Sequence, residues 1–269
     1  ATDMATVNED DSNSVDLTSS VSALCKVNAK AILCEEAPEK TLLDLMQSYQ
    51  NSGENAQALV ESMRGSDSFN WGYDPANYNV PEGSYSSDPA NPTARITELK
   101  QAIQSMHSIG LRVNMDVVYN HVYDTSKFSQ NLITPGYFFR TDENGALTNG
   151  TGVGNDVASE RPMVRKFIVD SVKYWATEYN LDGFRFDLMG IHDIQTVNEI
   201  TAALKVIDPT IIVIAEGWNM GTLPDDQKAN QINIAKLNNV AMFNDQIRDG
   251  LKGSVFNATD TGWATGKIS

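Results

Sequence analysis

Arg185 and Asp187 place a guanidinium and a carboxylate two residues apart, in an apolar segment typical of a strand. Because residues i and i+2 of a strand share a face, both side chains should point the same way, opposite Phe184 and Phe186. A guanidinium beside a carboxylate favours the ionised carboxylate, which suits a nucleophile. A plain buried ion pair has the same spacing, so the pattern alone leaves both interpretations open.

Glu216 ends a second apolar segment, Ile211 to Ala215, and is followed by Gly217 and Trp218. A carboxyl group among apolar neighbours tends to have a raised pKa, as a general acid requires. A helix-capping or ion-paired glutamate is the alternative. One strand–helix–strand unit of 29 residues separates Glu216 from Asp187, so neighbouring strands should carry them. Two carboxylates with opposed pKa shifts are the machinery of glycoside cleavage.

Two further features could contact a sugar. Phe69, Trp71 and Tyr73 lie around Gly72 in a short loop, and exposed aromatic rings stack on the apolar faces of sugars. The alternative is a loop that folds its rings inward. His121 follows another strand and is either a hydrogen-bonding pocket residue or a satisfied core histidine.

The elements that must position these residues alternate between strand and helix from about residue 92. Four strands separated by helices indicate an α/β fold with a parallel sheet, in which functional residues gather at the carboxyl ends of the strands. We expect strands over 111–118, 183–187, 211–216 and 240–243, helices over 92–109, 160–179 and 194–207, and a long connection over 121–159.

Residues 1–66 differ from the rest and predict an acidic loop and helical insertion, followed by the catalytic domain over 67–269. This segment holds 11 acidic and 4 basic residues, including the run Glu9, Asp10 and Asp11. Helix-type spacing predicts two short surface helices, over 38–50 and 54–64.

Composition excludes several classes of function. The net charge of −15 repels phosphate backbones, which argues against nucleic-acid binding. The longest apolar run, Ile211 to Ala215, is far too short to span a bilayer. Three histidines and two cysteines show no metal-ligand spacing, so no metal site is expected. Cys25 and Cys34 could form one local disulfide or remain free thiols, and the compartment stays open.

Several ordered motifs resemble the α-amylase family of glycoside hydrolases, and within it the type I pullulanases. The resemblance covers roughly residues 67–255. The motifs that carry it are Asp116 to His121, Asp182 to Gly190 and Ala215 to Trp218, with support from Phe69 to Tyr85, Gly154 to Asp170 and Phe243 to Gly253.

The resemblance implies a partial (β/α)8 TIM barrel and a role for each matching residue. Asp187 would be the nucleophile, Glu216 the general acid/base and Arg185 the residue that orients Asp187 and keeps it ionised. His121 and Tyr73 would contact the sugar at the cleavage point, and Trp218 would line the cleft. Asn120 matches a position that binds calcium in some relatives; this match does not establish calcium, and no other cofactor is expected. Asp116, Asp245 and Asp249 are expected to be structural.

The implied reaction is retaining cleavage of α-1,6-glucosidic bonds in pullulan and branched α-glucans. It requires carboxyl groups about 5–5.5 Å apart, rather than about 6.5–9.5 Å as in inverting enzymes.

The sequence departs from the family in two respects. Only about strands three to six of the eight can be placed, and the family's third carboxylate, an Asp after a His near the seventh strand, has no match. His192 and Asp193 follow the nucleophile strand directly, which is the wrong place. We therefore expect a fragment of a longer enzyme that is inactive by itself. The alternatives are an isoamylase or α-1,4-acting amylase, or a non-catalytic glucan-binding remnant.

Overall fold

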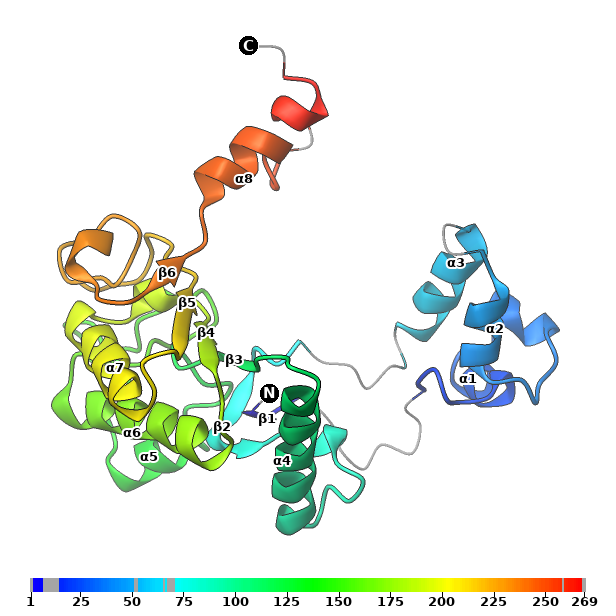
Figure 1. Ribbon diagram of the computed structural model, residues 1–269, viewed down its shortest axis with the longest axis horizontal. Helices are drawn as coiled ribbons and strands as arrows, with labels where there is room; N and C mark the ends of the chain where they lie inside the picture. The colour runs from blue at the N-terminus through cyan, green and yellow to red at the C-terminus, as the bar shows by residue number, and fades with distance from the viewer. Residues whose placement is uncertain are drawn as a thin grey trace. The chain divides into compact units, whose positions relative to one another are not determined.

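The computed structural model describes residues 2–6, 15–50, 53–64, 66, 71–257 and 259–267. Contacts divide it into two compact units, one of residues 1–3, 74–81 and 99–269, the other of 4–73 and 82–98. Each unit is described by itself (Figure 1). The acidic run at 9–11 and Phe69 lie outside the described residues, and the predicted domain boundary after residue 66 stays a prediction.

The unit that holds most of the N-terminal segment is built on three short helices: α1 (Val21–Val27), α2 (Leu42–Ser48) and α3 (Glu54–Met63). Ser20 caps α1, and Thr41 forms a capping box with Asp44 at α2, which satisfies backbone N–H groups that each helix leaves unpaired. Buried apolar side chains from all three helices form one cluster, which includes Leu24, Leu45 and Leu59. The prediction of α3 is confirmed and α2 is shorter than predicted, whereas α1 was missed.

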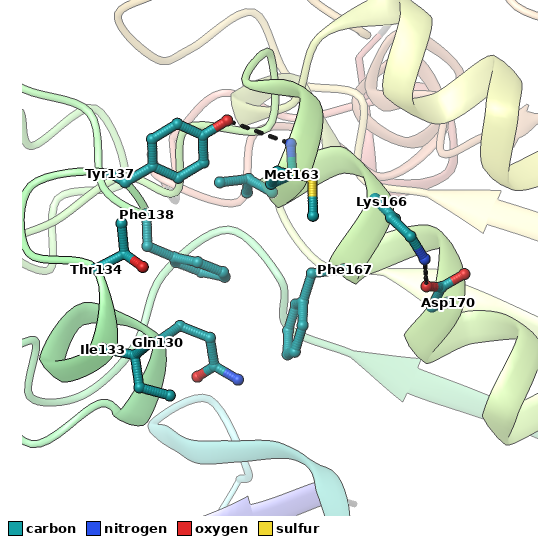
Figure 2. Close-up of a pocket in the computed structure, with 10 residues that line it drawn as sticks. Gln130, Ile133, Thr134, Tyr137, Phe138, Met163, Lys166, Phe167 and Asp170 are labelled. Carbon is teal, nitrogen blue, oxygen red and sulfur yellow. Dashed lines mark hydrogen bonds and ion pairs between the residues drawn. The ribbon is translucent and has the colours of Figure 1, made fainter.

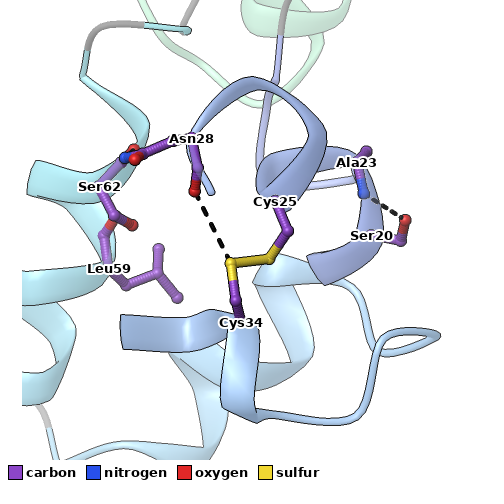
Figure 3. Close-up of a disulfide and its surroundings, with 7 residues drawn as sticks. All are labelled: Ser20, Ala23, Cys25, Asn28, Cys34, Leu59 and Ser62. Atoms are coloured by element: carbon purple, nitrogen blue, oxygen red, sulfur yellow. Dashed lines mark hydrogen bonds between the residues drawn. A yellow bond between two sulfur atoms is a disulfide. The ribbon is translucent and has the colours of Figure 1, made fainter. Parts of the chain in front are cut away.

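A disulfide joins Cys25 of α1 to Cys34 of the short 3-10 helix η1 (Ile32–Glu35), so the alternative of free thiols is wrong (Figure 3). The bond closes a loop with a sequence separation of 9 residues. The Asn28 side chain lies within this loop and donates to the Ser62 carbonyl of α3 at 2.9 Å. The disulfide therefore holds a segment that is itself attached to α3.

The other unit contains the predicted parallel sheet. Its strands are β3 (Asn114–Val117), β4 (Gly183–Phe186), β5 (Ile212–Ala215) and β6 (Ala241–Met242). They pair in the order β3-β4-β5-β6, each parallel to its neighbour. The described residues thus show an open four-stranded sheet with helices, and the closed barrel stays a prediction.

Helices cover this sheet and complete its core (Figure 1). They are α6 (Pro162–Glu178) and α7 (Ile194–Ile207), which pack against each other, together with α4 (Pro92–Ser108). Phe184, Phe186 and Trp175 are fully buried in the resulting cluster. The predicted helices are confirmed within two residues at each end.

Besides α1, four further elements among the described residues escaped the sequence analysis. β1 (Thr2–Met4) and β2 (Pro75–Pro81) pair in a separate two-stranded sheet, and β2 is held to α6 by Trp175, whose Nε1 donates to the Tyr78 carbonyl at 2.9 Å. The long connection contains α5 (Ser129–Ile133), and α8 (Asp245–Lys252) follows the last strand. Among the described residues, no helix is long and apolar enough to cross a membrane.

Replacing Cys25 and Cys34 with serine should destabilise the helical unit. Loss of the cross-link lets the unfolded chain gain conformational entropy, and a loop of this size corresponds to about 2–3 kcal/mol of unfolding free energy. Urea unfolding of the double variant, compared with the parent with and without a reductant, measures the effect. The double variant should match the reduced parent, and equal stability of variant and oxidised parent would contradict the assignment.

Candidate active site

The carboxyl ends of β3, β4 and β5 bring Asp116, Arg185, Asp187 and Glu216 together. Asp116 and Arg185 are paired residues of β3 and β4. Asp187 and Glu216 directly follow their strands, and their backbone N–H groups still donate to the neighbouring strand, to Val117 and Phe186, each at 3.0 Å. The ladder therefore fixes the backbone of both residues at one edge of the sheet.

One guanidinium, that of Arg185, contacts three carboxylates. Its Nη1 lies 2.8 Å and 3.0 Å from the two Asp116 oxygens and 3.2 Å from Asp187 Oδ1. Its Nη2 lies 2.7 Å from Glu216 Oε1. These three carboxylates carry more negative charge than one arginine neutralises. Because Asp187 and Glu216 contact the same guanidinium, their carboxyl groups lie on the same side of the site. The expected distance between the two carboxyl groups stays a prediction.

Asn120 positions Asp187 by two hydrogen bonds. Its side chain is fully buried, and its Nδ2 donates at 2.9 Å both to Asp187 Oδ2 and to the Asp187 carbonyl. Its Oδ1 lies 2.5 Å from His121 Nδ1. Because an amide oxygen only accepts, this contact assigns the proton to Nδ1.

His121 is itself buried, and its backbone carbonyl accepts from the Tyr78 hydroxyl at 2.6 Å. His121 directly follows Asn120, whose amide holds Asp187. The expected contact of His121 with substrate stays a prediction. Within the described ranges, no cluster of three or more His, Cys, Asp or Glu side chains could hold a metal ion.

The pKa of Asp187 is raised to about 6, and the expected role of Arg185 in keeping this carboxylate ionised stays a prediction. Burial is the main cause, opposed by the hydrogen bond from Asn120 and by the Arg185 charge, and reinforced by the charges of Glu216 and Asp116. Arg185 is shared among three carboxylates and cannot offset burial and repulsion together. At this pKa Asp187 is still about nine-tenths ionised at pH 7.

Glu216 forms an ion pair, which is the alternative that the sequence analysis leaves open for this residue. Besides the ion pair with Arg185, its Oε2 accepts from the Leu188 backbone N–H at 3.3 Å. Leu188 has φ 41°, a left-handed conformation that is costly for a branched side chain and aims this N–H at Glu216. Gly190 allows the Trp218 backbone to pack closely against this turn, because a Cβ at position 190 would lie 2.0 Å from the Trp218 carbonyl oxygen.

Two aromatic rings near the ends of the strands contact arginine side chains, and one of these arginines is Arg185 of the cluster. The ring of Phe243, directly after β6, lies 5.8 Å from the Arg185 guanidinium, and Trp218 lies 5.9 Å from that of Arg248. The sequence analysis named Trp218 as a cleft residue but gave Phe243 no role, although its place after a strand was a usable signal. Tyr73 belongs to the other unit, with 39% of its surface exposed, and its place beside the carboxylates stays a prediction.

A buried polar network supports the loop that follows Glu216. Asp156 accepts from Thr148, Gly150, Thr151 and Thr222, and burial would raise its pKa, but these hydrogen bonds outweigh it and lower the value. Arg140 donates to Thr222 at 3.2 Å. Arg140 and Asp156 belong to the long segment 121–159, and Thr222 belongs to the loop after β5 that begins with Glu216. These hydrogen bonds therefore hold the two segments together.

His192 and Asp193 are confirmed to lie outside the carboxylate cluster. Asp193 caps α7 and pairs with Arg165 at 3.1 Å. His192 is buried, and burial lowers its pKa to about 4, so the ring is neutral at pH 7.

Replacing Asp187 with asparagine should stabilise the protein at neutral pH, because it removes a buried and repelled charge. The pKa of Asp187 in the folded protein is about 6, above the ordinary 3.8. Ionisation of Asp187 therefore lowers the free energy of unfolding progressively as pH rises from 3.8 to about 6, and the loss is constant above that range. The gain should therefore grow over that window and level off at about 1–3 kcal/mol. Urea unfolding of both proteins between pH 4 and about 8 measures it. A variant that is less stable than the parent at pH 7 would contradict the assignment.

Comparison with known proteins identifies relatives along most of the chain. A family model described as the Pullulanase Ins domain matches residues 4–69. The pullulanase of Bacillus subtilis (strain 168) is 50% identical over 213 residues, 79% of this chain and 30% of that protein. The pullulanase of Klebsiella aerogenes is 36% identical over 264 residues, 93% of this chain and 24% of that protein.

A solved structure gives the same result. The pullulanase of Paenibacillus barengoltzii in complex with maltohexaose and α-cyclodextrin is 53% identical, with a TM-score of 0.73 over 75% of this chain and 31% of that chain. The chain thus spans about a quarter to a third of the length of the relatives it matches. Its motifs, its parallel sheet and these relatives together show that the chain is homologous to the pullulanases of the α-amylase family.

Proposed function

We propose that this chain supplies the nucleophile and the acid/base of a glycoside hydrolase that cleaves α-1,6-glucosidic bonds in pullulan and branched α-glucans. The observation that carries the proposal is the Arg185 guanidinium, which lies within 3.2 Å of Asp187 and 2.7 Å of Glu216. The two carboxylates follow adjacent parallel strands at their carboxyl ends. This arrangement suits a sugar placed between them.

The proposed reaction has two steps. Asp187 attacks the anomeric carbon and forms a glycosyl ester, while Glu216 gives its proton to the departing glycosidic oxygen. Glu216 then takes a proton from water, whose oxygen attacks the same carbon and releases Asp187. The two inversions leave the anomeric configuration unchanged.

The geometry of the free protein puts one requirement on these two reaction steps. Glu216 must carry a proton when it acts as the acid, so substrate binding has to replace its ion pair with Arg185. Arg185 would then serve Asp187 and Asp116 alone, which favours the ionised nucleophile. His121, Trp218 and Tyr73 are the proposed sugar contacts, and no cofactor enters the proposal.

We further propose that turnover requires barrel strands beyond the four described ones. The relatives are about three to four times as long as the stretch matched here, and the family's third carboxylate has no counterpart in this sequence. The cleavage products distinguish an α-1,4-acting or isoamylase-type enzyme from this proposal. A glucan-binding remnant would bind glucan without cleaving it.

Maltotriose release from pullulan tests the function. The chain as given should release none. A chimera that carries this chain in place of the matching portion of the Paenibacillus barengoltzii pullulanase should release maltotriose, since pullulan yields it only by α-1,6 cleavage. In the chimera, Asp187→Asn and Glu216→Gln should each lower the rate about a thousandfold or more.

The exposed Asp225 provides the matched control, because Asp225→Asn makes the same chemical change after β5 outside the cluster. This variant should keep the parent rate. A folded chimera that binds maltotriose without releasing it from pullulan would overturn the catalytic assignment and favour the binding remnant. Products that retain their α-1,6 bonds would favour an α-1,4-acting enzyme.

A further inference from the structure

His192 is a buried histidine whose ring makes no hydrogen bond among the described residues. Only 1% of its surface is exposed, and neither Nδ1 nor Nε2 has a partner there. A neutral imidazole needs one donor and one acceptor, whereas a protonated one needs two acceptors. The buried site is therefore unfavourable for the neutral ring and much more unfavourable for the charged one.

His192 differs in this respect from Gln130, whose Oε1 is also buried without a partner among the described residues. The Gln130 side chain lines a pocket between α5 and α6 (Figure 2). An amide keeps the same charge at every ordinary pH, whereas an imidazole in water gains a charge near pH 6.5. Mild acidification therefore acts on His192 and not on Gln130.

His192 lies where three segments of the chain meet. It ends the turn that follows Asp187, and its carbonyl accepts from the Ala229 N–H, in the loop after β5, at 2.9 Å. Arg140, from the long segment 121–159, donates to the neighbouring Ile191 carbonyl at 3.3 Å. The turn after Asp187 is thus joined at this point both to the loop that begins with Glu216 and to the long segment.

The charged groups around the ring do not compensate its burial. Burial lowers the pKa of His192 to about 4, although the charges of Asp193 and Glu160 oppose this effect, and the charge of Arg140 reinforces it. Lys228 lies in the loop after β5, next to the residue that donates to His192, and its ammonium group is paired at 2.7 Å with an exposed aspartate. None of these segments offers the ring a free acceptor.

The two nearby carboxylates already have partners. Asp193 caps α7 and pairs with Arg165 at 3.1 Å. Glu160 pairs with Arg140 at 2.8 Å. A protonated His192 ring is therefore satisfied only if one of these pairs breaks or if the junction opens to water.

We propose that His192 is an acid-sensitive joint, whose protonation separates the turn after Asp187 from the loop after β5 and so loosens the Glu216 segment while the sheet stays folded. The inference goes beyond the proposed function, because the joint opens with or without a glucan. If the proposed function holds as well, the joint sets an acid limit on turnover.

The direction of the pH dependence follows from the two states of the ring. In the open state the ring reaches water and has an ordinary pKa near 6.5, whereas in the closed state its pKa is about 4. The open state therefore binds the proton more readily between these values. Opening becomes more favourable as pH falls from about 6.5 to about 4 and does not change above that range.

Hydrogen exchange of single backbone amides, followed by NMR on the whole chain, tests the proposal. The Ala229 N–H reports on the joint, and the amides of β4 report on the sheet. The protection factor of Ala229 should fall roughly 30-fold between pH 8 and pH 5, while the amides of β4 stay more strongly protected. Exchange at pH 5 and above avoids the range in which ordinary carboxylates gain protons.

His192→Phe keeps a ring at this position and removes both nitrogens, so the protection factor of Ala229 should then be the same at pH 8 and pH 5. His107→Phe is the matched control, because His107 is half-buried on α4 and pairs with Asp182 outside the joint. This variant should keep the parent's pH response at Ala229.

Three results would overturn the proposal: an Ala229 protection factor that does not change with pH, an unchanged pH response in His192→Phe, or Ala229 exchange no faster than that of β4. If His192→Phe fails to fold, the imidazole signals of His192 in the unsubstituted chain decide. A ring that is neutral at pH 5.5 supports the joint, and a ring already protonated at that pH overturns it. Maltotriose release by the chimera tests the proposed function separately.

Discussion

The site depends on one interaction, the sharing of the Arg185 guanidinium by Asp116, Asp187 and Glu216. A buried carboxylate is unfavourable without a counter-charge, and here one cation serves three. The deficit falls on Asp187, the most buried of them, whose pKa rises to about 6. The ionised Asp187 therefore lowers the stability of the folded protein at neutral pH.

The surrounding structure serves to hold this unfavourable arrangement. The parallel ladder fixes the backbones of Asp187 and Glu216, Asn120 adds two hydrogen bonds to Asp187, and the left-handed Leu188 directs an N–H to Glu216. Farther out, the network around Asp156 secures the loop that follows Glu216. A substrate that takes over one contact of Arg185 would redistribute charge among groups whose positions are already set.

The sequence predicts the scaffold of the site well, because the strands around Phe184 and Val213 have buried apolar runs and the helices between them have regular periodicity. It therefore predicts that Arg185, Asp187 and Glu216 share one edge. It does not predict the charge balance, since the pairing of Asp116 with Arg185 depends on strand register. Short elements such as α1 and α5 escaped because five to seven residues carry too little periodicity.

The most direct test of this account is a carbon-13 NMR titration of the Asp187 side-chain carboxyl in the folded protein. The account predicts a midpoint near pH 6. It also predicts a lower midpoint in Glu216→Gln, because that substitution removes a negative charge that raises the pKa of Asp187. A midpoint at or below the ordinary value of 3.8 would show that Arg185 compensates Asp187 fully, and would contradict the account.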